Sequence, residues 1–162
     1  MWKSKTLWLL AGCVWLGLLN VGQAEDKVSD EKAKLEKEFS DAMTGSTLVG
    51  NFSVDGKEAQ PAKDEKYTLV SVKKVEGDQW LIVARIQYGD HDVTVPVPLE
   101  VKWAGDTPVM TLTDLTIPKM GTFTSRVMIY RGRYAGTWQH DKVGGNMWGR
   151  LVKQAAEEKP KE

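Results

Sequence analysis

The chain alternates apolar and polar side chains in eight short runs, and this alternation constrains its fold more than any other feature. The apolar members of the clearest run are Val93, Val95, Val97, Leu99, Val101 and Trp103. A spacing of two places such residues on one face of an extended strand. Run 80–88 repeats the pattern, and less regular runs follow it at 47–54, 66–75, 109–117, 122–130, 134–140 and 146–153.

The breaks between the runs have the composition of tight hairpins. Gly77-Asp78, Gly105-Asp106 and Arg131-Gly132 each separate two runs, and glycine supplies the positive φ that such turns need. Consecutive hairpins without a crossover helix predict an antiparallel meander. We therefore expect an all-β domain at 46–153, an eight-stranded antiparallel up-and-down β-barrel, with a split barrel or a two-sheet β-sandwich as the alternative.

Two prolines in the clearest run bear on the choice between these architectures. Pro96 and Pro98 lie two residues apart, so the amide hydrogens that they lack would face the same neighbouring strand. That side of the strand cannot form a regular ladder. We expect an edge or a bulge there, which a split barrel or a sandwich accommodates more easily than an unbroken ring.

Alternate connections of a meander lie at the same end. One end receives the longest predicted connection, 55–65, together with 89–92, 118–121 and 141–145. Binding residues concentrate on long loops held by a rigid scaffold, so this end is the predicted mouth. The interior of an eight-stranded barrel is either filled by side chains or just wide enough for one small ligand.

The N-terminus has the pattern of an export signal. A basic start precedes an apolar run of 13 residues, 7–19, which is shorter than the roughly 20 residues of a membrane-spanning helix. The small residues Gly22 and Ala24 predict cleavage after Ala24, a periplasmic or secreted protein, and no stable membrane anchor afterwards. The alternative is a lipoprotein anchored through Cys13, since Leu10-Ala11-Gly12-Cys13 has the form of a lipoprotein box.

The composition of the mature chain excludes several classes of function. Removing residues 1–24 leaves 20 basic groups against 22 acidic groups and no cysteine. A nucleic-acid partner is not expected, because such proteins usually carry a basic face. Without cysteine the mature chain has no disulfide, thiolate metal ligand or thiol nucleophile. We expect a single domain and no cofactor.

A helix and a tail flank the predicted barrel. Val28, Leu35, Phe39 and Met43 lie on one stripe at helical spacing, which predicts an amphipathic helix within 25–45. Ser29 is the expected N-cap and Gly45 the expected terminator. Residues 154–162 are polar and aperiodic, and predict a disordered tail.

Aromatic residues provide the candidate ligand-binding side chains. The mature chain has four tryptophans: Trp80, Trp103, Trp138 and Trp148. At alternating positions such residues ordinarily fill a core, and the other interpretation is a cavity lined for an apolar or planar ligand. Together with His91 and His140, both near the predicted mouth, the tryptophans are the candidate binding residues.

Both histidines stand beside aspartates, in Asp90-His91-Asp92 and His140-Asp141. Imidazole and carboxylate groups are common metal ligands. However, the third and fourth strands lie across a barrel from the seventh and eighth, too far apart for two ligands whose bonds to one metal are about 2.1 Å long. Aspartates in hairpins are also ordinary turn formers, so we expect no metal site and regard these residues as weak candidates.

Catalytic motifs are missing from the sequence. It has no HExxH pattern, no nucleophile elbow and no phosphate-binding glycine loop between a strand and a helix. Asp114, an acid in an otherwise apolar run, is expected to lie at a bulge or to face water. An enzyme is therefore disfavoured.

Two stretches carry a resemblance to known proteins. They are YGDHDVTVPVPLEVKWAGDTPVMTLTDLTIPKMGTFTSRV (Tyr88–Val127) and YAGTWQHDKVGGNMWGR (Tyr134–Arg150). They resemble an uncharacterised family of secreted bacterial proteins, mainly from planctomycetes, and this resemblance implies no particular activity. In pattern the chain is also similar to lipocalin-type barrels, through Gly50 and the Gly136–Trp138 segment, although Phe52 stands where the first strand of a lipocalin has tryptophan.

Two functions follow as expectations. The first is an exported β-barrel that binds a small apolar or planar ligand at its loop-rich end. The second is a structural or adaptor domain of the cell envelope that acts through protein contacts.

Overall fold

A helix followed by eight strands makes up the chain in the computed structural model, which describes residues 19–153 apart from Asp90 and Lys119. The elements are α1 (Leu19–Met43), β1 (Ser46–Phe52), β2 (Lys63–Glu76), β3 (Gln79–Tyr88), β4 (His91–Ala104), β5 (Thr107–Ile117), β6 (Gly121–Tyr130), β7 (Arg133–His140) and β8 (Val143–Lys153). Most of the predicted export signal, with Cys13, and the predicted tail at 154–162 lie outside the described residues.

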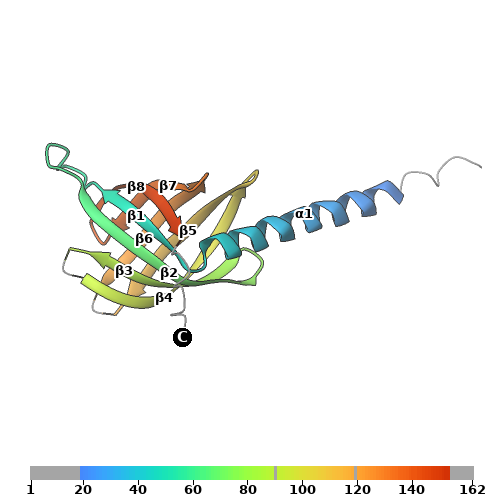
Figure 1. Cartoon of the computed structure of the whole chain (residues 1–162), viewed down its shortest axis with the longest axis horizontal. Helices are drawn as coiled ribbons and strands as arrows, with labels where there is room; N and C mark the ends of the chain where they lie inside the picture. The colour runs from blue at the N-terminus through green and yellow to red at the C-terminus, as the bar shows by residue number, and fades with distance from the viewer. Residues whose placement is uncertain (1–18, 90, 119, 154–162) are drawn as a thin grey trace, which may run out of the picture. The chain divides into compact units, whose positions relative to one another are not determined.

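The strands close into an up-and-down barrel (Figure 1). Each strand pairs antiparallel with the next, and β8 pairs with β1 from Ser46↔Lys153 to Phe52↔Met147. The predicted eight-stranded barrel is thus confirmed. All eight predicted runs became strands, because apolar residues at a spacing of two bury one face of each strand in a common interior.

The prolines of β4 lie where its ladder with β5 is interrupted. β4 pairs with β3 along its whole length, including Val83↔Pro96 and Leu81↔Pro98. Its ladder with β5 runs only from Glu100↔Thr111 to Ala104↔Thr107. The missing amide hydrogens therefore lie on the β5 side, as expected, and the irregularity is absorbed within a closed barrel rather than splitting it.

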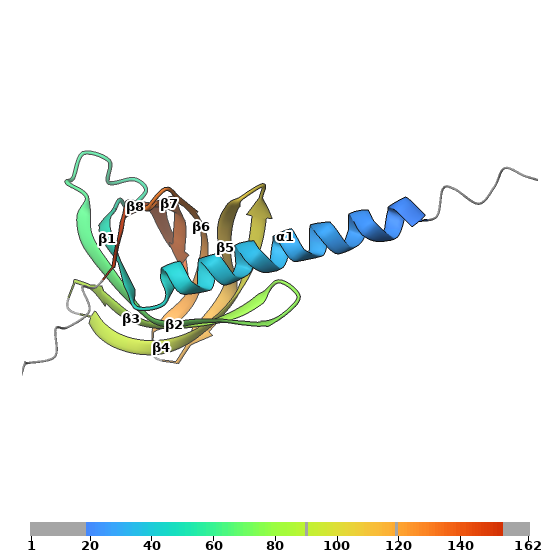
Figure 2. The ribbon, with the colours of Figure 1, turned by 45° about the vertical axis from the view of Figure 1, so that its right-hand side comes forward.

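The two ends of the barrel have different connections (Figure 2). The β2–β3, β4–β5 and β6–β7 turns at one end are two residues each, and the long 53–62 connection between β1 and β2 lies at the other end. The predicted 141–145 loop is wrong. β8 begins at Val143, and Gly145 pairs with Trp138, so only Asp141 and Lys142 form the turn.

The boundary between two compact units lies within the helix α1. Leu19–Leu35 forms part of one unit, and the residues from Glu36 onward form the other together with the barrel. The helix continues through Ser29, so the predicted N-cap there is wrong. Its end is as predicted: α1 stops at Met43, and Gly45 adopts a φ of 71°, which glycine tolerates without strain.

The barrel is packed most tightly around the end that carries the two-residue turns. Phe39 and Met43 of α1 are buried there with Val72, Trp80 and Val101. Toward the other end several inward side chains are only partly buried, among them Leu112, Leu115 and Phe123. One end of the barrel is therefore closed and the other is open.

Candidate functional site

The closed end is sealed by the last turns of α1. The Phe39 ring meets Trp80 edge-on with the ring centroids 5.2 Å apart, and it meets Trp103 in the same way at 6.0 Å. The Ser40 hydroxyl donates to the carbonyl of Val72 at 2.6 Å, and Lys74 forms an ion pair with Glu36. These contacts fill the closed end of the barrel, so a ligand would have to enter from the open end.

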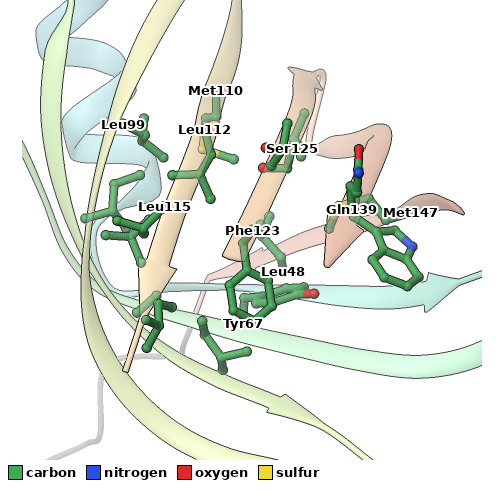
Figure 3. A pocket seen from close by; sticks show the side chains of 18 of the residues that line it. Leu48, Tyr67, Leu99, Met110, Leu112, Leu115, Phe123, Ser125, Gln139 and Met147 are labelled. Carbon is green, nitrogen blue, oxygen red and sulfur yellow. The ribbon is translucent and has the colours of Figure 1, made fainter. Parts of the chain in front are cut away.

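A cavity of about 180 Å³ occupies the interior above this seal. Its walls are almost entirely apolar, and Figure 3 shows Leu99, Leu112 and Leu115 on one side and Met147 on the other. The aromatic rings of Tyr67, Phe123 and Trp138 stand along its outer part. A site of this kind can bury an apolar group but offers few polar partners to orient it.

A second cavity, of about 240 Å³, lies at the mouth and shares Tyr67, Phe123 and Trp138 with the first. The complete lining of this mouth cavity is Phe52, Glu65, Tyr67, Phe123, Trp138, His140 and Val143. The three shared aromatic residues form the boundary between the two spaces. A molecule that reached the inner cavity would therefore have to pass the aromatic residues and Glu65.

Glu65 is the most unusual residue of the mouth. It is 4% exposed although it carries a carboxyl group. The Tyr67 hydroxyl donates to its Oε2 and the Tyr134 hydroxyl donates to its Oε1, each at 2.8 Å. Burial raises the pKa of Glu65, and the two tyrosine hydrogen bonds oppose that rise only in part. Among the described residues, no lysine, arginine or histidine forms an ion pair with it.

Glycines in two strands allow Tyr134 to reach Glu65. The register places Glu65, Gly50, Gly149 and Tyr134 in one row across β2, β1, β8 and β7. A Cβ on Gly149 would lie 2.6 Å from Cε1 of Tyr134, and a Cβ on Gly50 would collide with the Tyr134 hydroxyl. The tyrosine ring thus lies across two residues that have no side chains, and its buried hydroxyl has a pKa raised first by desolvation and then by Glu65.

Trp138 and His140 complete the wall of the mouth on β7. The Trp138 indole N–H donates to the Ser53 carbonyl at 3.1 Å, and its ring meets Phe52 edge-on at 5.5 Å. The His140 ring stacks on Phe123 with centroids 4.4 Å apart and an angle of 14° between the planes. Both side chains are therefore held in place by aromatic neighbours, as a preformed site requires.

The candidate tryptophans separate into three locations. Trp138 lines both cavities, whereas Trp80 and Trp103 lie at the closed end against Phe39. Trp148 is 42% exposed and lines neither cavity. Its neighbours Met147 and Gly149 take the inward positions of β8, so the alternation of the strand turns Trp148 outward.

The candidate metal-ligating residues are not gathered together. His140 lies in the mouth with its Nε2 3.5 Å from Oδ2 of Asp141, whereas Asp92 is exposed and forms an ion pair with Arg85 that lowers the Asp92 pKa. Asp90 and the side chain of His91 lie outside what the structure describes. Within the described part of the chain, no three His, Cys, Asp or Glu side chains cluster closely enough to hold a metal ion.

Asp114 lies at the bulge that the sequence suggested. The β5–β6 register shifts between Leu112 and Leu115, and Asp114 is exposed there with a φ of 50°. The Thr124 hydroxyl donates to its carboxylate at 2.9 Å. These contacts give Asp114 a structural role in the bulge and keep it outside both cavities.

Sequence reasoning missed Glu65, Tyr67 and Tyr134 as site residues. The sequence pattern places Glu65 at the end of the predicted 55–65 connection, whereas β2 already begins at Lys63. The signal that could have identified it is the spacing of two in Glu65, Tyr67 and Leu69, which continues the inward face of β2 back to Glu65.

Comparison of the chain with family models, with curated proteins and with solved structures finds no match. Across the described residues, no helix is both long enough and apolar enough to cross a membrane.

Proposed function

We propose that this barrel binds a small, mostly apolar molecule in the cavity at its open end. The observation that carries the proposal is the asymmetry of the interior, which is sealed by Phe39 and Met43 at one end and hollow at the other. A cavity of about 180 Å³ is slightly larger than the roughly 150 Å³ apolar cavity that accommodates benzene. A single ring or a chain of about six carbons is the expected size of the buried group.

The proposed location of the protein follows from its sequence. The basic start, the apolar run 7–19 and the small residues before Glu25 support export and cleavage after Ala24. Mass spectrometry of the protein purified from its own host tests this, because a mature chain that begins at Glu25 is expected. An intact N-terminus, or a lipid on Cys13, would contradict the proposed processing.

The binding proposal can be tested with 1-hexanol and ¹³C-methyl methionine labelling. Met110 and Met147 line the inner cavity, whereas Met128 is 45% exposed on the barrel surface. Hexanol should shift the NMR signals of Met110 and Met147 in a saturable manner and leave that of Met128 in place. Each buried methylene contributes about 0.8 kcal/mol, so six give at most about 5 kcal/mol, a Kd no tighter than about 0.2 mM.

A matched pair of variants shows whether the cavity is responsible. Leu112→Trp fills the inner cavity, because Leu112 lines it. Leu81→Trp adds the same bulk at a leucine that is 37% exposed and does not line the cavity. Binding should be lost in Leu112→Trp and kept in Leu81→Trp. A folded wild-type protein whose Met110 and Met147 signals do not respond to hexanol or benzene would contradict the proposal.

A further inference from the structure

The mouth of the cavity contains a buried acid, Glu65. Glu65 lines the mouth cavity and is 4% exposed, and no described basic group forms an ion pair with it. Burying a carboxylate without a cation is costly unless a partner compensates for its lost hydration. The described residues supply Glu65 with two hydroxyl donors and with no cation in an ion pair, so among them the site is incomplete for an ionised carboxylate.

The groups around Glu65 are suited to a cation. Phe52, Tyr67, Phe123 and Trp138 line the same cavity as the carboxyl group. The faces of aromatic rings attract ammonium groups, and several rings around one space form a binding site for them. An anionic ligand group would instead meet the carboxyl oxygens, and a purely apolar group would leave them without a partner.

The tyrosine hydroxyls also favour a cationic partner for Glu65. Tyr67 and Tyr134 both donate to the carboxyl oxygens of Glu65, and donors aimed at a carboxylate favour its ionised form. Each oxygen can accept more than one hydrogen bond. The carboxylate therefore keeps acceptor capacity for an N–H group that arrives from the mouth.

We infer that the barrel selects ligands with a positively charged amine head and an apolar tail, the ammonium lying beside Glu65 among the mouth aromatics and the tail filling the inner cavity. This inference rests on the proposed function and names its class of ligand. The boundary residues Tyr67, Phe123 and Trp138 line both cavities, so one molecule can place its head in one space and its tail in the other.

Several titratable groups besides Glu65 lie at or near the mouth. Of the described side chains, the titratable ones that face the site are Tyr67 on β2 and Tyr134 and His140 on β7. The neighbours of Glu65 in its cross-strand row are Gly50 on β1 and Tyr88 on β3. Lys63, two residues before Glu65 on β2, is exposed. Asp141 lies 3.5 Å from His140. Measurements at pH 8 keep hexylamine charged, and the comparison of Glu65→Gln with wild type isolates the contribution of Glu65.

The experiment compares three probes that share a six-carbon chain: hexylamine, 1-hexanol and hexanoate. Each is titrated at pH 8 into ¹³C-methionine-labelled wild-type protein, Glu65→Gln and the control Glu76→Gln, which changes an exposed carboxylate on the same strand. Wild type and Glu76→Gln should bind hexylamine about tenfold or more tightly than hexanol, since hydrogen bonds to charged groups are stronger than neutral ones. Hexanoate should bind most weakly.

The variant Glu65→Gln should lose the preference for the amine while keeping its affinity for hexanol within about twofold, which also shows that it is folded. Hexanol binding without a preference for hexylamine in wild type would overturn the inference and leave the proposed function standing. The same holds if hexanoate binds most tightly, or if Glu65→Gln keeps the preference. Failure of all three probes to bind the wild-type protein would overturn both.

Discussion

Tyr134 on β7 donates a 2.8 Å hydrogen bond to Glu65 on β2, although the strands β8 and β1 lie between them. The bond exists because Gly149 and Gly50 occupy the two intervening positions of the row. One side chain thus ties four adjacent strands together and fixes the acid of the mouth. The structure of the site and the stability of the barrel are therefore coupled.

Removing this hydrogen bond should destabilise the protein. Tyr134→Phe keeps the ring over the glycines but leaves Oε1 of Glu65 buried without its donor, which costs about 1–3 kcal/mol of unfolding free energy. The pKa of Glu65 should rise further, because the bond lowers it. Urea denaturation and carboxyl NMR titration measure the two effects. The control Tyr130→Phe removes a hydroxyl from a tyrosine that is 45% exposed, and an equal loss there would contradict the interpretation.

A side chain in the space beneath Tyr134 should destabilise the protein at least as much as Tyr134→Phe does. A Cβ on Gly50 would lie 2.7 Å from Cα of Gly149 and would collide with the Trp148 carbonyl and the Tyr134 hydroxyl. Overpacking of this kind costs about 1–3 kcal/mol, so Gly50→Ala should lower the midpoint of urea denaturation. The exposed strand position Thr94 provides the control, since Thr94→Ala adds no atoms. If both variants unfold at the same midpoint, the close approach of Tyr134 is not a constraint.

The buried acid should make stability depend on pH. Burial raises the pKa of Glu65 above its ordinary value of 4.5, so the folded protein binds this proton more tightly than the unfolded chain does. This tighter proton binding stabilises the folded protein fully at a pH below the Glu65 pKa of the unfolded chain. The stabilisation is lost as the pH rises through the Glu65 pKa of the folded protein. Glu65→Gln removes this titration. The unfolding free energy of Glu65→Gln minus that of wild type should therefore be larger at pH 7 than at pH 4. Urea denaturation of both proteins at each pH measures this difference.

Glu76→Gln serves as the control for the pH experiment, because Glu76 is an exposed carboxylate of the same strand. Its stability difference from wild type should change little across the same range. A difference between Glu65→Gln and wild type that does not change with pH would show that the acid titrates alike in the folded and unfolded states.

The seal at the closed end should be a major source of stability. Phe39 is 5% exposed and packs against two tryptophans. Replacing a buried phenylalanine by alanine costs about 3–5 kcal/mol, so Phe39→Ala should lower the unfolding free energy by that amount. Val75→Ala, at a residue 66% exposed, should change it far less. Equal values in calorimetry would mean that α1 does not close the barrel.

The sequence predicted the barrel well because its signal is local. Alternation fixes which face of a strand is buried, and the glycine turns fix which strands are neighbours, so eight strands and their order followed from short segments. The limits of β2 and β8 are predicted less accurately, because the sequence pattern places Lys63–Glu65 and Val143–Gly145 in loops and the structure places them in strands.

The site was harder to predict because it depends on contacts between distant segments. β8 turns Met147, Gly149 and Leu151 inward. Gly149 has no side chain and so contributes little hydrophobic signal to that face, and Tyr134 from β7 occupies the space that a side chain would take. The large Trp148 therefore suggested the wrong face. Glu65 likewise draws its significance from Tyr134, 69 positions away in sequence, a separation that no local pattern reveals.

Among the described residues, the ladder between β4 and β5 does not extend along His91–Leu99, which leaves an edge on that side of β4. An uncovered edge of this kind commonly recruits a strand from another molecule and begins aggregation. Pro96 and Pro98 deprive this edge of two donors at neighbouring pairing sites. The same prolines that interrupt the ladder therefore leave this edge with fewer free amide donors for a strand of another molecule to pair with.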